Sequence, residues 1–280
     1  MAKQPRNLAG RVVAISGAAR GIGRATATAL HREGMTVAIG DLDAELGART
    51  AAEIGPGVAA YPVDVCDRAS FERFVDRVET DLGPLGVLVN NAGIMPLGSF
   101  LEEDDRTARR MIDVNVHGVL HGMKIVLPRM VSRQSGHLVN IASTAGRVGF
   151  AGGATYSGTK HFVVGVSEAA RIELRGTGVE VSVIMPGVVD TELGAGVGSS
   201  RGVRKVAPEA VAAAIAGTLG RPRFDVFVPR TIAPLTAMAG VLPRSARDVV
   251  TRALRADRVL TDVDAGARRS YEDRAARSEP

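Results

Sequence analysis

The chain has 280 residues, of which 45% are hydrophobic and 23% charged, so it can bury a large core and is neither disordered nor fibrous. Its net charge of +5 comes from arginines interleaved with acidic residues, and only 4% of its residues are aromatic, which predicts no nucleic-acid partner. A single cysteine, Cys66, excludes an internal disulfide and a cysteine-based zinc site.

The N-terminal sequence MAKQPRNLAGRVVAISG has no apolar segment ahead of a cleavage site, and therefore no secretory signal. No stretch elsewhere approaches the ~20 apolar residues that a membrane-spanning helix needs. We therefore expect a cytoplasmic protein.

Short apolar runs rich in valine and isoleucine alternate with longer segments of helical periodicity. The runs predict strands at Val12–Ser16, Thr36–Gly40, Val58–Val63, Val87–Val89, His137–Ile141, Glu180–Ile184 and Asp225–Val228. The longer segments predict helices at Gly21–Glu33, Ala44–Ile54, Arg68–Asp81, Asp104–Arg133, Thr155–Arg175 and Pro208–Leu219. Strands that are apolar on both faces and alternate with helices predict an α/β fold, a doubly wound parallel sheet of the Rossmann type. We expect one domain over residues 8–220 and a C-terminal extension over residues 221–280.

Two segments interrupt this alternation. Val188–Val206 is rich in glycine and serine and has no periodicity, and because it follows the sixth predicted strand we interpret it as a mobile lid. The extension contains an apolar stretch, Thr231–Pro243, followed by a helix-like tail of mixed arginine and acidic residues. That stretch is too short to span a bilayer. It could cap a substrate cleft, lie at a subunit interface or contact a membrane surface, and we favour a core or interface role over the membrane surface.

The first predicted strand leads into a glycine-rich turn, Gly17-Ala18-Ala19-Arg20-Gly21-Ile22-Gly23, and then into a helix. A helix N-terminus exposes unpaired N–H groups and a partial positive charge, which suit a pyrophosphate. The glycines let the backbone approach the phosphates without an intervening Cβ. The spacing is G-x-x-x-G-x-G rather than G-x-G-x-x-G, and its strand–turn–helix context predicts dinucleotide binding.

The second predicted strand ends at Gly40-Asp41, about twenty residues after the glycines. A carboxylate there can accept hydrogen bonds from the adenosine ribose and repels a 2′-phosphate. Arg20 in the glycine turn could instead reach a 2′-phosphate. We give Asp41 more weight, because its repulsion is direct whereas Arg20 can turn into solvent, and we predict NAD rather than NADP. Asp41 could also be a helix-capping acid, which is compatible with either cofactor.

Further motifs accompany the glycine turn: Asn90-Asn91-Ala92-Gly93 after the fourth predicted strand, Asn115 in a helical segment, Ser143 after the fifth strand, Tyr156 and Lys160 in Y-x-x-x-K, and Pro186-Gly187 after the sixth strand. Together they resemble the short-chain dehydrogenase/reductase family in its compact single-domain form, over about residues 8–220. Ser16 stands where that family usually has threonine, and the tail is longer than its usual ending. The resemblance implies an oxidoreductase that interconverts an alcohol and a carbonyl by hydride transfer to or from NAD(H).

The catalytic chemistry can also be argued from the residues. Tyr156 and Lys160 are one helical turn apart, so their head groups can converge on one site. A tyrosine with a pKa of about 10 is a poor base at neutral pH, and a neighbouring ammonium lowers that pKa. Ser143, at the end of a parallel strand, can hold the substrate oxygen. The resemblance implies that Tyr156 transfers the proton, that Lys160 also binds the nicotinamide ribose and that Asn115 holds a relay water.

The resemblance also assigns the residues that contact the dinucleotide. These are Gly17, Arg20, Gly21, Ile22, Gly23, Asp41, Leu42, Asp64, Val65, Asn91, Ala92, Gly93, Tyr156, Lys160, Pro186, Gly187, Val189 and Thr191. Asp64 and Val65 would flank the adenine, while Val189 and Thr191 would contact the nicotinamide carboxamide. The family also implies a homodimer or homotetramer, in which Asp104–Arg133 and Thr155–Arg175 pair between subunits.

Two alternatives to this function stay open. One is an NADP-dependent reductase of the same fold. The other is a dinucleotide-binding regulator without turnover, which would not need a proton-transferring Tyr156. Apolar residues such as Met95, Val148 and Phe150 predict a hydrophobic alcohol or ketone as the small-molecule substrate.

Two other signals are given a structural interpretation. His117 and His121 are four residues apart, as in a metal pair, but no third ligand accompanies them and we predict no metal site. Cys66 is interpreted as a small buried apolar residue rather than a nucleophile.

Overall fold

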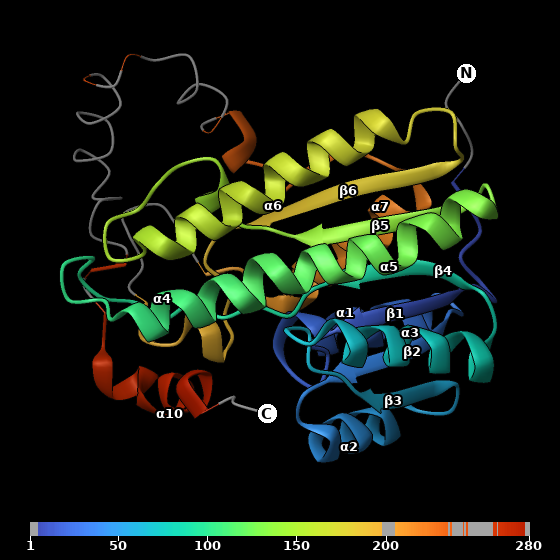
Figure 1. Ribbon diagram of the computed structural model, residues 1–280, viewed down its shortest axis with the longest axis horizontal. Helices are drawn as coiled ribbons and strands as arrows, with labels where there is room; N and C mark the ends of the chain where they lie inside the picture. The colour runs from blue at the N-terminus through green and yellow to red at the C-terminus, as the bar shows by residue number, and fades with distance from the viewer. Residues whose placement is uncertain are drawn as a thin grey trace.

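The computed structural model describes residues 5–197, 205–234, 236, 243, 245, 260–261 and 263–277. Its strands form one sheet in the order β3-β2-β1-β4-β5-β6-β7, and every neighbouring pair is parallel (Figure 1). The strands are β1 (Val12–Ser16), β2 (Thr36–Asp41), β3 (Val58–Pro62), β4 (Leu85–Asn90), β5 (Gly136–Ile141), β6 (Val179–Pro186) and β7 (Asp225–Val228). The strand order reverses between β1 and β4, so the predicted doubly wound parallel sheet is confirmed.

Helices cover both faces of this sheet. The α-helices that the structure describes are α1 (Gly21–Arg32), α2 (Ala44–Ile54), α3 (Arg68–Leu82), α4 (Asp105–Ile112), α5 (Gly118–Ser132), α6 (Ala154–Glu173), α7 (Pro208–Gly220) and α10 (Ala265–Arg277), of which α10 contacts the loop after β6 instead of a face of the sheet. Helices α3, α5 and α6 share one buried apolar cluster with the sheet, and α1, α2 and α7 share another on the opposite face. Strand β1 is buried along its whole length between these clusters, which explains its uninterrupted apolar sequence.

Local sequence signals place most of the element boundaries. Each observed bound lies within two residues of the predicted one, apart from the segment Asp104–Arg133. The Asp67 carboxylate accepts a hydrogen bond from Ala69 N at 2.9 Å and caps α3. Pro208 occupies the first turn of α7, where its missing N–H costs nothing.

The prediction of a single helix over Asp104–Arg133 is wrong in one respect. A π-helical turn, Asp113–His117, separates α4 from α5 along a continuous helical path. Such a turn inserts one extra residue without disturbing the apolar pattern enough to be seen from a 3.6-residue period. It places Asn115, which is fully buried, between the loop after β4 and α6. Turns of this kind are frequent at functional sites.

The C-terminal segment returns to the sheet in two places. Strand β7 pairs with β6 beyond residue 220, and α10 lies beside the loop that follows β6 (Figure 1). Residues 198–204 of the predicted lid, and residues 235 and 237–242 of Thr231–Pro243, lie outside the described residues. The division at residue 220 and the mobility of the lid therefore stay predictions. Within the described ranges no helix has the length and apolar character to cross a bilayer.

Candidate active site

A cavity of about 590 Å³ opens beside the carboxyl ends of the strands, where the strand order reverses. Its volume lies in the range of small-molecule and cofactor sites. It is lined by every predicted site residue except Gly23 and Asn115, namely Gly17, Arg20, Gly21, Ile22, Asp41, Leu42, Asp64, Val65, Asn91, Ala92, Gly93, Ser143, Tyr156, Lys160, Pro186, Gly187, Val189 and Thr191. Sequence segments far apart in the chain thus meet where a doubly wound sheet binds its ligand.

The glycine turn fits a dinucleotide. Gly17 and Gly21 have φ angles of +64° and +55°, which side chains rarely allow, and a Cβ on Gly17 would lie 2.7 Å from the Ala92 Cα. Helix α1 begins at Gly21, and the residue before it, Arg20, makes no side-chain capping bond. The first-turn N–H groups of α1 therefore have no side-chain cap at the cavity wall. A pyrophosphate is the kind of group that such a helix end binds.

Gly23 does not line the cavity but packs behind the glycine turn, and its contact with the dinucleotide stays a prediction. A Cβ there would lie 2.4 Å from the Gly17 carbonyl oxygen and 2.7 Å from Asn91 Nδ2. Asn91 Nδ2 also donates to that carbonyl at 2.8 Å. The Ser16 hydroxyl accepts from the backbone N–H groups of Asn91 and Ala92 at 3.1 and 3.2 Å. The motif after β4 therefore fixes the glycine turn to the end of β1.

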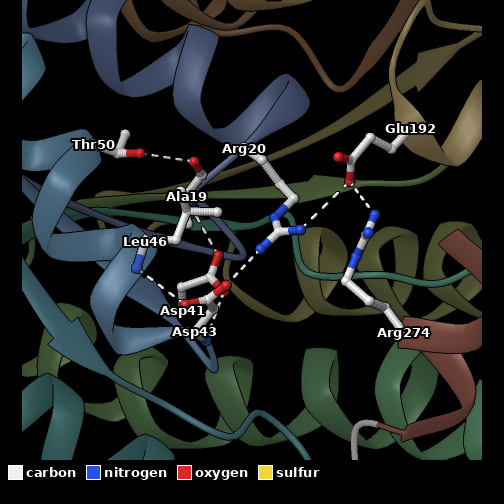
Figure 2. Close-up of polar contacts among 8 residues, drawn as sticks. All are labelled: Ala19, Arg20, Asp41, Asp43, Leu46, Thr50, Glu192 and Arg274. Carbon is white, nitrogen blue, oxygen red and sulfur yellow. Dashed lines mark hydrogen bonds and ion pairs between the residues drawn. The ribbon is translucent and has the colours of Figure 1, made fainter. Parts of the chain in front are cut away.

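Asp41 lies at the end of β2 beside the glycine turn. Its Oδ2 accepts from Ala19 N at 2.8 Å, and its Oδ1 accepts from Asp43 N at 3.1 Å (Figure 2). The cap of α2 is Asp43, which accepts from Leu46 N at 3.0 Å. Asp41 is therefore not the helix-capping acid that we had kept as its alternative role. Its carboxylate is fixed at the cavity wall.

The Arg20 side chain, which could turn into solvent, is paired with acidic side chains in this structure. Its guanidinium lies 2.7 Å from the Asp43 carboxylate and 3.5 Å from that of Glu192. Glu192 in turn pairs with Arg274 of α10 at 2.5 Å, so a chain of charges crosses from the glycine turn to α10 (Figure 2). These side chains are 35–55% exposed, so each pair contributes at most about 1 kcal/mol, and its main effect is to orient Arg20.

Three polar head groups converge at the deep end of the cavity. Tyr156 and Lys160 of α6 are 6% and 5% exposed. The Lys160 Nζ donates to the Ile141 carbonyl at 2.9 Å and lies 5.7 Å from the centroid of the Tyr156 ring. The Ser143 hydroxyl forms a hydrogen bond with the Tyr156 phenol and accepts from Ala145 N at 3.1 Å. A hydroxyl, a phenol and an ammonium thus surround one point.

Burial is the largest influence on the pKa values of Tyr156 and Lys160. It raises the pKa of Tyr156 to about 12, an effect that the Ser143 hydrogen bond partly offsets. It also lowers the pKa of Lys160 to about 8, because the ammonium is removed from water. Burial is thus the dominant influence on the Tyr156 phenol, and the net shift of its pKa is opposite in sign to the one expected from the neighbouring ammonium alone. Lys160 is the group whose proton is more easily lost, and Tyr156 is held as a neutral phenol.

Asn115 does not line the cavity but forms hydrogen bonds with two segments that do. Its Oδ1 accepts from Ile94 N at 2.9 Å, and its Nδ2 donates to the Ile94 carbonyl at 2.9 Å and to the Thr159 hydroxyl at 3.1 Å. Both amide hydrogens are used, so the side chain connects the loop after β4 to α6. Its role with a relay water stays a prediction.

The C-terminal segment contributes to the cavity, although no sequence motif predicts it. Leu260, Tyr271, Arg274 and Ala275 also line the cavity. The only available signal was that Tyr271 is the sole aromatic residue after Phe227. Met95 and Phe150 line the cavity as predicted for the substrate end, whereas Val148 does not.

The histidine pair and the cysteine that the sequence analysis interpreted as structural both contact other parts of the fold. His121 Nδ1 lies 2.9 Å from the Val65 carbonyl oxygen, and the rings of His117 and His121 are edge to face with centroids 6.4 Å apart. Cys66 is half-buried, and burial raises the pKa of its thiol to about 12. A thiol with that pKa is a poor nucleophile at neutral pH.

Comparison with known proteins agrees with this geometry. A profile of the short chain dehydrogenase family matches residues 11–202. Sorbitol dehydrogenase from Cereibacter sphaeroides is 41% identical over 186 residues, which cover 66% of this chain and 73% of that protein. Galactitol 2-dehydrogenase from Agrobacterium fabrum is 37% identical over 183 residues, which cover 65% and 72%.

Solved structures give the same result. A short chain dehydrogenase/reductase from Burkholderia phymatum in complex with NAD superposes with a TM-score of 0.77 at 26% identity, covering 83% of this chain and 93% of that one. A 3-ketoacyl-(acyl-carrier-protein) reductase from Brucella melitensis complexed with NADH gives a TM-score of 0.72 at 27% identity, covering 79% and 97%.

Proposed function

This chain belongs to the short-chain dehydrogenase family and is an oxidoreductase that interconverts an alcohol and a carbonyl with a nicotinamide dinucleotide. We propose that Ser143, Tyr156 and Lys160 carry out the reaction and that NAD is the cofactor. The observation that supports the site is the convergence of these three head groups in one cavity with the glycine turn. The bound dinucleotide would accept or supply the hydride. The residues of the chain would hold the substrate oxygen and transfer the proton.

Each residue has a distinct part in the reaction. Ser143 holds the substrate oxygen beside the phenol with which its own hydroxyl forms a hydrogen bond. Tyr156 gives its proton to that oxygen in reduction and takes it back in oxidation. Lys160 lies close enough to the ring to stabilise the phenolate electrostatically, and its own lowered pKa lets it pass a proton on.

The experiment that tests this function is a redox assay over paired secondary alcohols and ketones, with absorbance of the reduced nicotinamide as the readout. The proposal expects turnover with at least one pair. Tight dinucleotide binding without turnover on any pair would instead favour the regulator. The regulator is disfavoured because it needs neither the buried phenol nor the ammonium beside it.

Three carboxylates support the choice of NAD. Asp41, Asp43 and Glu192 surround the place where the glycine turn meets the end of β2, and they would repel the added charge of a 2′-phosphate. Arg20 is already paired with two of them. We therefore expect NADH to bind more tightly than NADPH in a fluorescence titration. Tighter binding of NADPH would favour the NADP-dependent alternative.

The substrate is a small alcohol or ketone that enters beside the apolar residues Met95, Phe150 and Leu260. Two of the relatives are named for sorbitol and galactitol, which are polyols. An apolar wall together with polyol-oxidising relatives supports a substrate with both a hydrocarbon part and hydroxyl groups.

The assembly we propose is a homodimer or homotetramer. Ile112, Phe162 and Ile172 lie on helices α4 and α6 and are 40%, 38% and 47% exposed. Large apolar side chains exposed on these two helices support a contact between copies. Light scattering after size-exclusion chromatography tests this, and a monomeric mass would contradict it.

A further inference from the structure

Helix α10 forms a fixed wall of the cavity, held by a buried arginine. Arg268 is 1% exposed. Its guanidinium donates to the Met95 carbonyl at 2.6 Å and to the carbonyls of Leu193 and Ala195 at 3.0 and 2.9 Å. One side chain thus joins α10 to the loop after β4 and to the loop after β6. A buried charge with this many partners is costly to detach, so α10 is an integral part of the cavity.

The segment before α10 is docked just as closely. Asp264 N donates to the Gly196 carbonyl at 3.0 Å, and Val263 forms an antiparallel bridge with Val197. A Cβ added to Gly196 would lie 2.5 Å from the Asp264 carbonyl oxygen. The loop after β6 and the C-terminal segment therefore pack without room for a further carbon atom.

This wall carries Tyr271 into the cavity that holds Tyr156. Its phenol oxygen accepts from Met95 N at 2.7 Å, and its ring lies beside the Arg268 guanidinium. The phenol's own proton has no acceptor among the residues that the structure describes. Burial raises the pKa of Tyr271, so the group is a protonated donor at any working pH.

We propose that Tyr271 donates a hydrogen bond to a second oxygen of the substrate, so that α10 selects alcohols and ketones with another hydroxyl or carbonyl group close to the reacting carbon. The inference rests on the proposed function of the cavity and adds a specificity residue to it. Tyr271 lies beyond residues 11–202, the part of the chain that the family profile matches. The selectivity would therefore belong to the C-terminal extension.

The surroundings of Tyr271 give this hydrogen bond its effect. Met95, Phe150 and Leu260 form one apolar cluster that also contains Tyr156, and they supply no side-chain acceptor to the Tyr271 proton. A substrate without a second oxygen would leave that buried donor unpaired. Sites built to bond a substrate oxygen reject analogues without it for this reason.

Binding rather than turnover provides the test. The Tyr156→Phe chain, saturated with oxidised nicotinamide dinucleotide, is titrated calorimetrically with matched probes: cyclohexanol against trans-cyclohexane-1,2-diol, and butan-2-ol against butane-2,3-diol. The proposal expects the diol of at least one pair to bind roughly 10-fold more tightly than the alcohol. Adding Tyr271→Phe should bring that ratio to about one by weakening the diol alone. Tyr61→Phe, which removes a phenol bonded to Asp81 outside the cavity, is the control and should leave the ratio unchanged.

Two results would overturn the proposal. One is equal affinity for the diol and the alcohol in every pair before Tyr271 is changed. The other is a Tyr271→Phe effect that weakens diol and alcohol equally, because the unpaired Met95 N–H would then account for it. Neither result depends on turnover, so a failure of the proposed function, seen as no redox activity in the unmodified chain, is separately recognisable.

Discussion

The Lys160 ammonium lies 5.7 Å from the centroid of the Tyr156 ring and has the Ile141 carbonyl as its hydrogen-bond acceptor at 2.9 Å. A cation is thereby held in a site where both side chains are almost fully buried. A buried ammonium lowers the stability of the folded chain, and the first prediction below depends on this cost.

The first prediction concerns the stability of a Lys160→Met variant. Burial lowers the pKa of Lys160 from 10.5 to about 8, so only the unfolded chain keeps the proton between these values, and the stability of the parent rises with pH across this window. Below pH 8 the buried ammonium costs about 3 kcal/mol, which the variant avoids, although it leaves the Ile141 carbonyl unpaired at a cost of about 1–3 kcal/mol. At pH 7 the free energy of unfolding of the variant should therefore equal or exceed that of the parent. By pH 10.5 it should have fallen by about 3 kcal/mol relative to that of the parent. Urea unfolding at both pH values measures this, and a pH-independent difference would contradict it.

A second prediction concerns cofactor choice. Asp41→Ser removes the carboxylate that Ala19 N fixes beside the glycine turn, so NADPH affinity should rise roughly 10-fold relative to NADH. Asp43→Asn is the matched control, because asparagine can still cap α2 while the charge paired with Arg20 is lost. Fluorescence titration of both reduced dinucleotides should show NADH still preferred in the control. If the ratio of NADH to NADPH affinity changed only in Asp43→Asn, the preference for NADH would instead be assigned to the pairing of Arg20.

The third prediction concerns the docking of α10. Gly196 has a φ of +68°, and an added Cβ would lie 2.5 Å from the Asp264 carbonyl oxygen. Gly196→Ala should displace the C-terminal segment and lower kcat/KM by roughly 10-fold or more, because α10 forms part of the substrate cavity. Gly176→Ala separates backbone strain from collision, since Gly176 has a φ of +83° but no atom within 4 Å of its added Cβ. It should cost about 1–2 kcal/mol of stability without changing kcat/KM.

A fourth prediction concerns acid stability. His137 is buried in β5 with its Nε2 2.8 Å from the Ser182 hydroxyl, and burial lowers its pKa from 6.5 to about 3. The unfolded chain binds a proton there below pH 6.5 while the folded chain does not, so this residue removes up to about 1.4 kcal/mol of stability per pH unit as the pH falls toward 3. His137→Phe should flatten the stability profile between pH 6 and 4, measured by urea unfolding, and an unchanged slope would rule out this cause.

Much of the fold was predictable because its signals are local. Strands buried on both faces read as apolar runs, and a residue such as Asp67 marks the start of α3 by its own capping bond. The glycine turn and Tyr156–Lys160 were found for the same reason, since their chemistry depends on spacing within one segment. Asp41 was found because its strand ends at the carboxyl edge of the sheet.

What the sequence did not predict depends on contacts between distant segments. Arg268 lies in a segment whose composition is that of a solvent-exposed helix. Only the fold places its guanidinium within hydrogen-bond distance of three carbonyl groups from two loops. Tyr271 becomes part of the cavity for the same reason. The ionisation of Tyr156 was predicted with the wrong sign, because spacing shows the neighbouring ammonium of Lys160 but not the burial of both groups. The π-helical turn at Asn115 left no mark on the apolar period.

The assignment of Tyr156 as the proton-transferring residue is tested most directly by Tyr156→Phe, measured for turnover and for NADH binding on the same preparation. The substitution removes only the phenol oxygen, and the glycine turn and Asp41 that would hold the dinucleotide are unchanged. We expect kcat to fall by about 10²–10⁴-fold while the Kd for NADH stays within about threefold. Full activity of Tyr156→Phe would contradict it.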